Sequence, residues 1–170
     1  MKQLTLCLIH EHLPDNGAGP RVLLGMKKRG FGANRWNGYG GKPDDGESIE
    51  DAAIREVKEE SGLTIDRGDL QKVGIAQFFF DGKPDWDQEV HIFLVEQWQG
   101  SLAETDEMKP EWFDVNAMPL EAMWVSDQVW VPRIVRDKKK LFVTTHFTAD
   151  GNQMISCKMQ EWKQGEIKVK

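Results

Sequence analysis

The stretch that decides the fold runs from Gly41 to Leu63 and reads GKPDDGESIEDAAIREVKEESGL. Ser48 followed three residues later by Asp51 approximates the capping box that begins many helices. Gly62 supplies the left-handed residue at which helices commonly end. We therefore predict a helix from about Ile49 to about Ser61, entered through a glycine-rich loop.

Three glutamates of this helix, Glu56, Glu59 and Glu60, fall within roughly 100° of one another at about 100° per residue. Like charges at this spacing repel by about 0.2–0.5 kcal/mol per pair, and Arg55 offers the local relief. Most acidic helical runs are solvated faces, but glycines surround this helix entrance and let backbone groups approach a ligand. Carboxylates suit Mg²⁺ or Mn²⁺, and Mg²⁺ commonly bridges them to substrate phosphates. The stretch therefore indicates a metal and phosphate site.

The spacing of this 23-residue stretch resembles the Nudix box at every fixed position. The matching positions are Gly41, Glu47, Arg55, Glu56, Val57, Glu59, Glu60, Gly62 and Leu63. The resemblance implies an α/β fold, namely a Nudix-type α/β/α sandwich with a mixed β-sheet. It also implies a metal-dependent hydrolase that cleaves a nucleoside diphosphate linked to another group.

Length and charge limit the classes of protein that the chain can belong to. Its 170 residues suffice for one well-filled core and are few for two, so we expect a single domain over residues 1–170. The net charge of −6 argues against binding a nucleic-acid backbone, which usually requires a basic face. We expect a monomer that acts on a small anionic substrate, a nucleoside triphosphate.

Cysteine usage and apolar runs indicate the compartment. Cys7 and Cys157 are isolated, so they form neither a metal-ligand spacing nor a disulfide framework. The apolar run Leu4–Ile9 is too short for a signal-peptide core or a membrane span. We therefore expect a cytoplasmic protein without membrane contact, and assign Leu4–Ile9 to the first strand.

Alternating apolar residues and turn signals predict the remaining elements. The expected strands are Lys2–His10, Arg21–Lys27, Leu70–Phe80, Glu89–Gln97, Glu111–Val115, Lys140–Thr148 and Gln153–Trp162. The expected connections are turns at Pro14–Gly19, Asp81–Pro84 and Ala149–Asn152 and a glycine-rich loop at Arg29–Gly41. A second helix is expected from Ser126 as N-cap to about Lys139, with Pro132 bending it or ending its first segment.

A wider resemblance extends beyond the box. The segments Arg21–Ala33 and Arg35–Gly38 are similar to the MutT-homologue branch of the family, the oxidised purine nucleoside triphosphatases that sanitise the nucleotide pool. Shorter matches occur at Ser61–Thr64, Asp106–Met108 and around Trp124. Together they cover the chain from about Thr5 to Phe142, leaving the C-terminal hairpin weakly matched.

This resemblance implies roles for individual residues. Metal binding, by Mg²⁺ or alternatively Mn²⁺, is implied for the Gly40 carbonyl, Glu56, Glu59, Glu60 and Glu107. Substrate contact is implied for Thr5, Lys27, Asn37, Tyr39, Gly40, Gly41, Lys42, Trp124, Val125, Ser126 and Asp127, with Phe31, Phe78 and Met108 lining the base pocket. Glu56 or Glu60 is favoured as the general base, and Glu107 remains open.

Several conspicuous residues are interpreted as structural. Tryptophan is usually a core residue, so Trp36, Trp112 and Trp130 are assigned to packing. His91 lies in an alternating strand and is expected to be a hydrogen-bonded structural histidine. Arg55 is expected to pair with Glu59 or to hold the loop, and Glu47 to support that loop.

One departure from the branch affects specificity. Where the branch carries two adjacent aspartates, this chain has Ser126 and Asp127, and a serine cannot share a proton as a second carboxylate would. We expect narrower base specificity, with 8-oxo-dGTP the leading candidate. Two alternatives remain: hydrolysis of a dinucleoside polyphosphate, sugar nucleotide or capped RNA, and a non-catalytic nucleotide sensor. A sensor would be expected to lose box glutamates, and this chain retains them.

Overall fold

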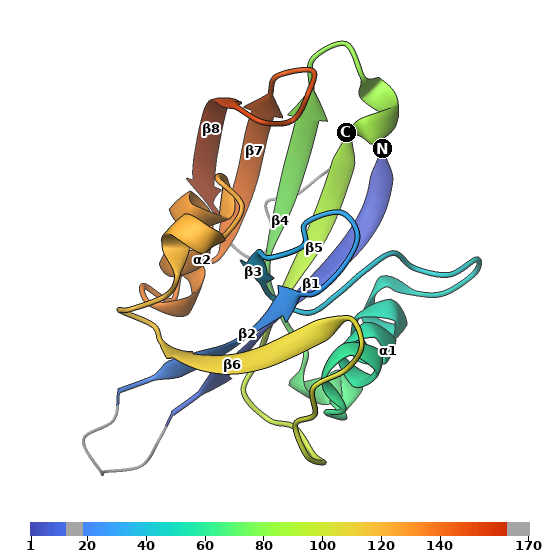
Figure 1. Ribbon diagram of the computed structural model, residues 1–170, viewed down its shortest axis with the longest axis vertical. Helices are drawn as coiled ribbons and strands as arrows, with labels where there is room; N and C mark the ends of the chain where they lie inside the picture. Colours follow the sequence, from blue (N-terminus) through green and yellow to red (C-terminus); the bar gives the residue numbers. More distant parts are fainter. Residues whose placement is uncertain (13–18, 163–170) are drawn as a thin grey trace.

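One eight-stranded sheet organises the computed structural model, which describes residues 1–12 and 19–162 (Figure 1). Its strands are β1 (Lys2–Glu11), β2 (Arg21–Lys27), β3 (Trp36–Asn37), β4 (Gln71–Phe80), β5 (Gln88–Val95), β6 (Met108–Asp114), β7 (Leu141–Phe147) and β8 (Met154–Glu161). Their order is β3-β2-β1-β5-β4-β7-β8, with β6 paired to β2. The pairs β1–β5 and β4–β7 are parallel and the others antiparallel, so the predicted mixed sheet is confirmed.

The two faces of the sheet carry separate apolar cores because side chains alternate along each strand. On β1, Leu6 and Leu8 belong to one core, whereas Cys7 and Ile9 belong to the other. The first core includes residues of helix α2 (Asp127–Val135), and the second includes residues of helix α1 (Ile49–Ser61). The helices therefore cover opposite faces, as the predicted α/β/α sandwich requires (Figure 1).

Helix α1 has the predicted bounds, and its local signals act as expected. The Ser48 hydroxyl accepts a hydrogen bond from the Asp51 backbone N–H at 3.1 Å. Gly62 adopts a left-handed conformation with φ 78°, and its N–H donates a hydrogen bond to the Lys58 carbonyl at 3.0 Å. These caps satisfy backbone groups that the helix ends would otherwise leave unpaired.

Helix α2 is shorter than predicted, although Ser126 occupies the predicted N-cap position. It ends at Val135 rather than Lys139, and Lys138 has a left-handed φ of 55° that a continuing helix cannot accommodate. Ser126 makes no side-chain capping bond and instead donates to the Asp127 carboxylate at 3.0 Å. Pro132 lies inside the helix and is buried. Within the described part of the chain, no helix has the length and apolar content to span a membrane.

The remaining differences from prediction arise from pairing between distant segments. Strand β3 lies inside the predicted loop Arg29–Gly41, where it pairs with β2. Strand β6 begins at Met108 because it follows β2 along its whole length, and β5 ends at Val95. Among the described residues, short 3₁₀ helices lie between α1 and β4 (Arg67–Asp69), between β4 and β5 (Pro84–Trp86) and between β6 and α2 (Leu120–Ala122). The predicted turn at Pro14–Gly19 lies almost wholly outside the described residues.

The left-handed end of α1 gives a test of the helix boundary. Gly62→Ala should lower the free energy of unfolding by about 1–2 kcal/mol, because alanine is strained at this φ and its Cβ would lie 3.0 Å from the Ser101 carbonyl oxygen. Gly68→Ala is the control, since its Cβ would enter open space. Urea unfolding of both variants measures the difference. Equal losses would contradict the assignment of Gly62 as the helix stop.

Candidate active site

The acidic edge of α1 lines a pocket of about 330 Å³. The opposite wall comes from the loop that precedes β6. The lining residues are Glu56, Glu59, Glu60, Thr105, Asp106 and Glu107. The structure thus brings together the four carboxylates that were predicted as a group, although Glu107 lies far from the others in sequence.

The glycine loop lies directly on two of these carboxylates. The Gly40 N–H donates to the Glu60 carboxylate at 3.1 Å, and a Cβ on Gly41 would lie 2.4 Å from a Glu56 oxygen. On the other side, a Cβ on Gly40 would lie 2.1 Å from the Thr5 carbonyl oxygen. The Thr5 N–H holds this loop through the Gly41 carbonyl at 2.8 Å. Glycine is required at Gly40, where a Cβ would clash with backbone, whereas a side chain at Gly41 would displace the Glu56 carboxylate.

Arg55 connects the acidic edge to the loop. Its guanidinium makes two bonds of 2.9 Å to the Glu47 carboxylate, and one N–H contacts Glu56 at 3.0 Å and Glu59 at 3.2 Å. A further N–H donates to the Lys42 carbonyl at 3.2 Å. Arg55 therefore both pairs with Glu59 and holds the loop, and Glu47 supports it, as the sequence predicted.

Burial and mutual repulsion make the pocket a poor environment for carboxylate charge. Burial raises the pKa of Glu60 to about 7; the Gly40 N–H opposes this shift, while Glu56 and Glu107 add to it. Burial also raises the pKa of Glu56 above its ordinary value, although the neighbouring arginine acts in the opposite direction. Hard oxygen donors with excess negative charge are the donor set that Mg²⁺ or Mn²⁺ prefers. The residues present therefore fit a divalent metal.

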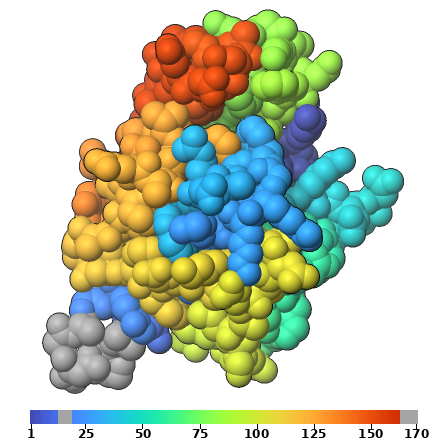
Figure 2. Space-filling model, in the orientation of Figure 1, coloured from blue at the N-terminus to red at the C-terminus, as the bar shows by residue number. Residues whose placement is uncertain are grey.

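A second group of predicted residues surrounds Trp124. The rings of Phe31 and Trp124 are stacked, with centroids 5.1 Å apart, and the Arg35 guanidinium lies 4.5 Å from the Trp124 ring centroid. Arg35 also donates to the Met123 carbonyl at 3.3 Å. Gly32 lies against the same indole, since a Cβ there would be 2.9 Å from it. Figure 2 shows this light-blue loop lying against the segment that leads into α2.

At the start of α2, Ser126 and Asp127 are both buried. Burial raises the pKa of Asp127 to about 7, against the opposing effect of its hydrogen bond from Ser126. A carboxyl group in this state can either donate or accept toward a ligand near neutral pH. Asn37 on β3 uses its side-chain oxygen to accept from the Gly38 N–H at 2.8 Å, which leaves its amide hydrogens as donors.

Some predicted substrate-binding residues lie elsewhere. The Tyr39 side chain is fully buried in the core beneath α1, and its backbone N–H and carbonyl both pair with Cys7, at 3.0 and 2.6 Å. Met108 is buried in the same core, whereas Phe78 packs on the α2 side. Phe31, the third apolar residue predicted to line the base pocket, is exposed and stacks on Trp124, so a pocket shared by Phe31, Phe78 and Met108 stays a prediction. Tyr39 therefore packs in the core, although it stands next to Gly40 in the sequence.

Two lysines predicted to contact the substrate, Lys27 and Lys42, lie close to residues of the acidic edge. Lys27 ends β2, and its charge lowers the pKa of Glu60. Lys42 follows the glycine pair, and its carbonyl is bound by Arg55. Val125 is half-buried directly before Ser126. These positions are compatible with phosphate contact by the lysines.

Sequence reasoning missed the cations that hold the wall opposite α1. Arg29 contacts Glu107 at 3.1 Å, and Lys28 donates to the Thr105 carbonyl at 2.7 Å. Both residues follow β2 directly, and the run of basic residues from Lys27 to Arg29 was the sequence signal that could have indicated them. Its partners could not be identified because they lie more than 70 residues away along the chain.

The residues assigned to structural roles have the expected environments. Trp36 and Trp130 are buried, and Trp112 packs against the core beneath α1. His91 has partners at both ring nitrogens, Lys72 at 2.9 Å and Gln3 at 2.7 Å. These contacts confirm His91 as a hydrogen-bonded structural histidine.

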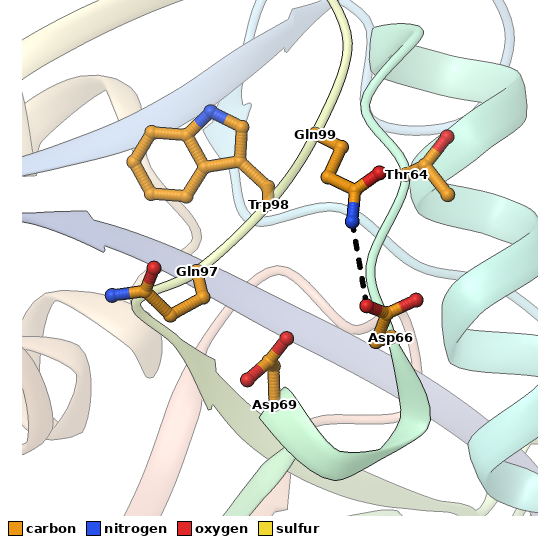
Figure 3. Close-up of a pocket in the computed structure, with 6 residues that line it drawn as sticks. All are labelled: Thr64, Asp66, Asp69, Gln97, Trp98 and Gln99. Carbon is orange, nitrogen blue, oxygen red and sulfur yellow. Dashed lines mark hydrogen bonds between the residues drawn. The ribbon is translucent and has the colours of Figure 1, made fainter.

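A smaller pocket of about 190 Å³ lies beyond the C-terminal end of α1 (Figure 3). It is lined by Thr64, Asp66, Asp69, Gln97, Trp98 and Gln99, so it shares no residue with the acidic pocket. The Gln99 side chain reaches across it to Asp66 at 3.5 Å. No residue predicted to bind substrate or metal lines this second pocket.

The fold and the acidic pocket together define the class of protein. The sequence pattern of the NUDIX domain matches residues 12–134, and the chain belongs to the Nudix family.

More specific similarities concern characterised relatives. Over 135 residues the chain is 48% identical to an oxidized purine nucleoside triphosphate hydrolase from Danio rerio, covering 79% of this chain and 83% of that protein. A protein of the same description from Mus musculus is 50% identical over 119 residues, covering 70% and 74% respectively. The crystal structure of a MutT protein from Bacillus halodurans superposes with a TM-score of 0.76 at 27% identity, covering 94% of this chain and 98% of that one. These similarities confirm the predicted family and fold.

The burial of Glu60 gives a pH-dependent stability that can be tested without metal. Its folded-state pKa of about 7 exceeds the ordinary value of 4.5, so the unfolded state releases this proton at lower pH than the folded state does. The unfolding free energy should therefore fall as pH rises from about 4.5 to about 7. Glu60→Gln should remove this contribution and stabilise the protein at pH 8 by on the order of 2 kcal/mol in EDTA, with little difference near pH 4.5.

The measurement is urea unfolding at both pH values, with the exposed Glu59→Gln as control. Added Mg²⁺ at pH 8 should restore stability to the unmutated protein more than to Glu60→Gln. The account of Glu60 would be wrong if the two variants showed the same change in stability between the two pH values.

Proposed function

We propose that this protein hydrolyses oxidised purine nucleoside triphosphates to the monophosphate and pyrophosphate and thereby sanitises the nucleotide pool. The observation that carries the proposal is the acidic pocket, which gathers the helix glutamates Glu56, Glu59 and Glu60 and adds Glu107 from the opposite wall. Two relatives near 50% identity are described as hydrolases of this substrate class. We propose a cytoplasmic monomer as its working form.

The carboxylates and the Gly40 carbonyl are the groups that would hold the metal. We propose Mg²⁺, with Mn²⁺ as the alternative, because both prefer oxygen ligands. When bound, a divalent ion of this kind polarises phosphoryl oxygens and lowers the pKa of coordinated water. The residues that would bind it are Glu56, Glu59, Glu60, Glu107 and the Gly40 carbonyl.

Glu56 and Glu60 are the favoured general bases for the attacking water. Both carboxylates have pKa values raised by burial, and a base whose pKa approaches the working pH is the most effective. The Arg55 contact orients Glu56, and the Gly40 N–H orients Glu60. Glu107 remains a third candidate because it lines the same pocket.

Recognition of the base is proposed for the group around Trp124. Its indole is stacked with the exposed ring of Phe31 and contacts Arg35, and the two rings together offer an aromatic surface for stacking. Asn37 and the buried Asp127 supply donors and acceptors for the polar edge of a purine. Lys27 and Lys42 would neutralise phosphate charge on the way to the acidic pocket.

The alternatives predict different substrates. If the protein acts on another Nudix substrate, such as a sugar nucleotide, its kcat/KM should show no preference for purine triphosphates. A nucleotide sensor would bind without turnover. Turnover of a panel of nucleotides in Mg²⁺, coupled to a pyrophosphatase and phosphate detection, separates the three functions. We expect the highest kcat/KM for an oxidised purine triphosphate; a preference for unmodified dNTPs or for a sugar nucleotide would contradict the proposal.

Removing one carboxylate tests the metal site. Glu59→Gln should lower turnover on the order of 100-fold at limiting Mg²⁺, because loss of a metal-binding charge weakens stabilisation of the transition state. Glu50→Gln removes the same charge from the first turn of α1, outside the pocket, and should leave turnover near that of the unmutated protein. Unchanged turnover of Glu59→Gln at limiting Mg²⁺ would rule out its role as a ligand.

Base specificity tests the Ser126 departure. Asp127 would be the one carboxyl group at the polar edge of the purine, and each of its protonation states matches the hydrogen bonds of one base form. One modified purine triphosphate should therefore have the highest kcat/KM, and 8-oxo-dGTP is the candidate. Ser126→Asp should broaden the range by restoring a coupled pair. The measurement is kcat/KM for 8-oxo-dGTP, 2-oxo-dATP, methylated purines and dGTP in both proteins. Equal values for the oxidised guanine and adenine substrates in the unmutated enzyme would contradict the argument.

A further inference from the structure

Two histidines and a glutamate meet at the ends of the parallel strands β1 and β5, outside the acidic pocket. Because Ile9 is paired with Val95, the next residues, His10 and Glu96, emerge side by side on the same face of the sheet. His12 lies two residues further on, so it faces the same side as His10. One ligand atom from each of the three side chains lies within 4.8 Å of the others.

The distances resemble those around a tetrahedral metal. A zinc ion with bonds of about 2.0–2.2 Å holds neighbouring ligand atoms about 3.4 Å apart. The His10 Nδ1 lies 3.4 Å from the Glu96 Oε1, and the His12 Nε2 lies 3.8 Å from the same oxygen. Small rotations of exposed side chains would complete this geometry, since Glu96 and His12 side chains are 34% and 63% exposed.

The surroundings show that the cluster already attracts a cation. The Lys138 ammonium lies 3.2 Å from the His10 Nε2 and 3.5 Å from the Glu96 carboxylate. The His10 side chain is fully buried. The Lys138 side chain is 43% exposed and can turn toward solvent.

We propose that His10, His12 and Glu96 form a binding site for a divalent transition metal of the zinc class, in competition with the Lys138 ammonium. Imidazole nitrogens with one carboxylate suit Zn²⁺ and its neighbours, whereas Mg²⁺ prefers oxygen ligands alone. The site is therefore chemically distinct from the acidic pocket. Three protein ligands leave a fourth position that solvent can reach. A bound metal would tie the ends of β1 and β5 together.

The test is a calorimetric titration of Zn²⁺ into the full chain at pH 7.5 with Mg²⁺ in excess, which occupies the carboxylate pocket. Every protein carries Cys157→Ser, so that this partly exposed thiol cannot bind Zn²⁺. The reference should bind one Zn²⁺ per chain. His12→Ala should weaken this binding at least about tenfold, the loss that removing even an outer-shell partner of a metal ligand produces.

Two further variants make the result specific. His146→Ala removes another exposed histidine, on β7 outside the cluster, and should leave Zn²⁺ affinity unchanged. Lys138→Gly should tighten Zn²⁺ binding roughly two- to fivefold, because it removes a competing charge and exposed charge pairs contribute about this factor. Glycine is chosen because it accepts the left-handed φ at this position. Circular dichroism confirms that each variant is folded. Equal affinity of the reference and His12→Ala, or no saturable Zn²⁺ binding by the reference, would overturn the proposal.

Discussion

The contact between the glycine loop and the carboxylates of α1 is the constraint on which the site depends. Gly40 fits against strand β1 only because it has no side chain, and the absence of a side chain at Gly41 leaves room for the Glu56 carboxylate. This close approach removes Glu56 and Glu60 from water and raises the pKa of both carboxyl groups. The helix keeps its position because Ala53 and Val57, which lie beside Glu60 on the helix surface, pack into the apolar core. Packing therefore stabilises a concentration of charge that the helix alone would disfavour.

The charges of the pocket are balanced from two directions. On the helix, Arg55 contacts three carboxylates and the loop carbonyl of Lys42, so it fixes the loop and the acidic edge together. On the opposite wall, Arg29 contacts Glu107. The arginine contacts leave Glu60, which is the most strongly perturbed carboxylate of the pocket, without a cationic hydrogen-bond partner among the described residues. The Gly40 N–H and the charge of Lys27 offset the effect of burial on the Glu60 pKa only in part, which explains why a divalent cation suits this position.

The sequence predicts the features that depend on local chemistry. The bounds of α1 follow from Ser48 and Gly62, whose effects reach only a few residues along the chain. The strands follow from alternation and the grouping of box glutamates from helical periodicity, whereas the mixed sheet was implied by the family resemblance. The early end of α2 could not be predicted, because Lys138 is left-handed and its side chain contacts His10 and Glu96, which lie far away along the chain. The family resemblance grouped Phe31, Phe78 and Met108 at the base, and the fold gives these side chains different surroundings: Phe31 is exposed on Trp124, Phe78 packs on the α2 side and Met108 is buried beneath α1.

Long-range contacts also decide which residues complete the site. Arg35 reaches the segment before α2 across 88 positions of sequence, and no periodic pattern connects the two. Tyr39 shows the converse, since a residue beside the glycine pair is carried into the core by its pairing with Cys7. Sequence reasoning thus identifies the chemistry of the α1 edge, while three-dimensional pairing determines which side chains face the substrate.

The most direct test of the central claim is product identification after incubation of the protein with 8-oxo-dGTP, in Mg²⁺ and in EDTA. Separation of the nucleotides and phosphorus resonance spectra of the released species identify the bond that is cleaved. The account predicts 8-oxo-dGMP and pyrophosphate in equal amounts with Mg²⁺, and neither in EDTA. Release of the diphosphate and inorganic phosphate, or cleavage that continues in EDTA, would contradict it.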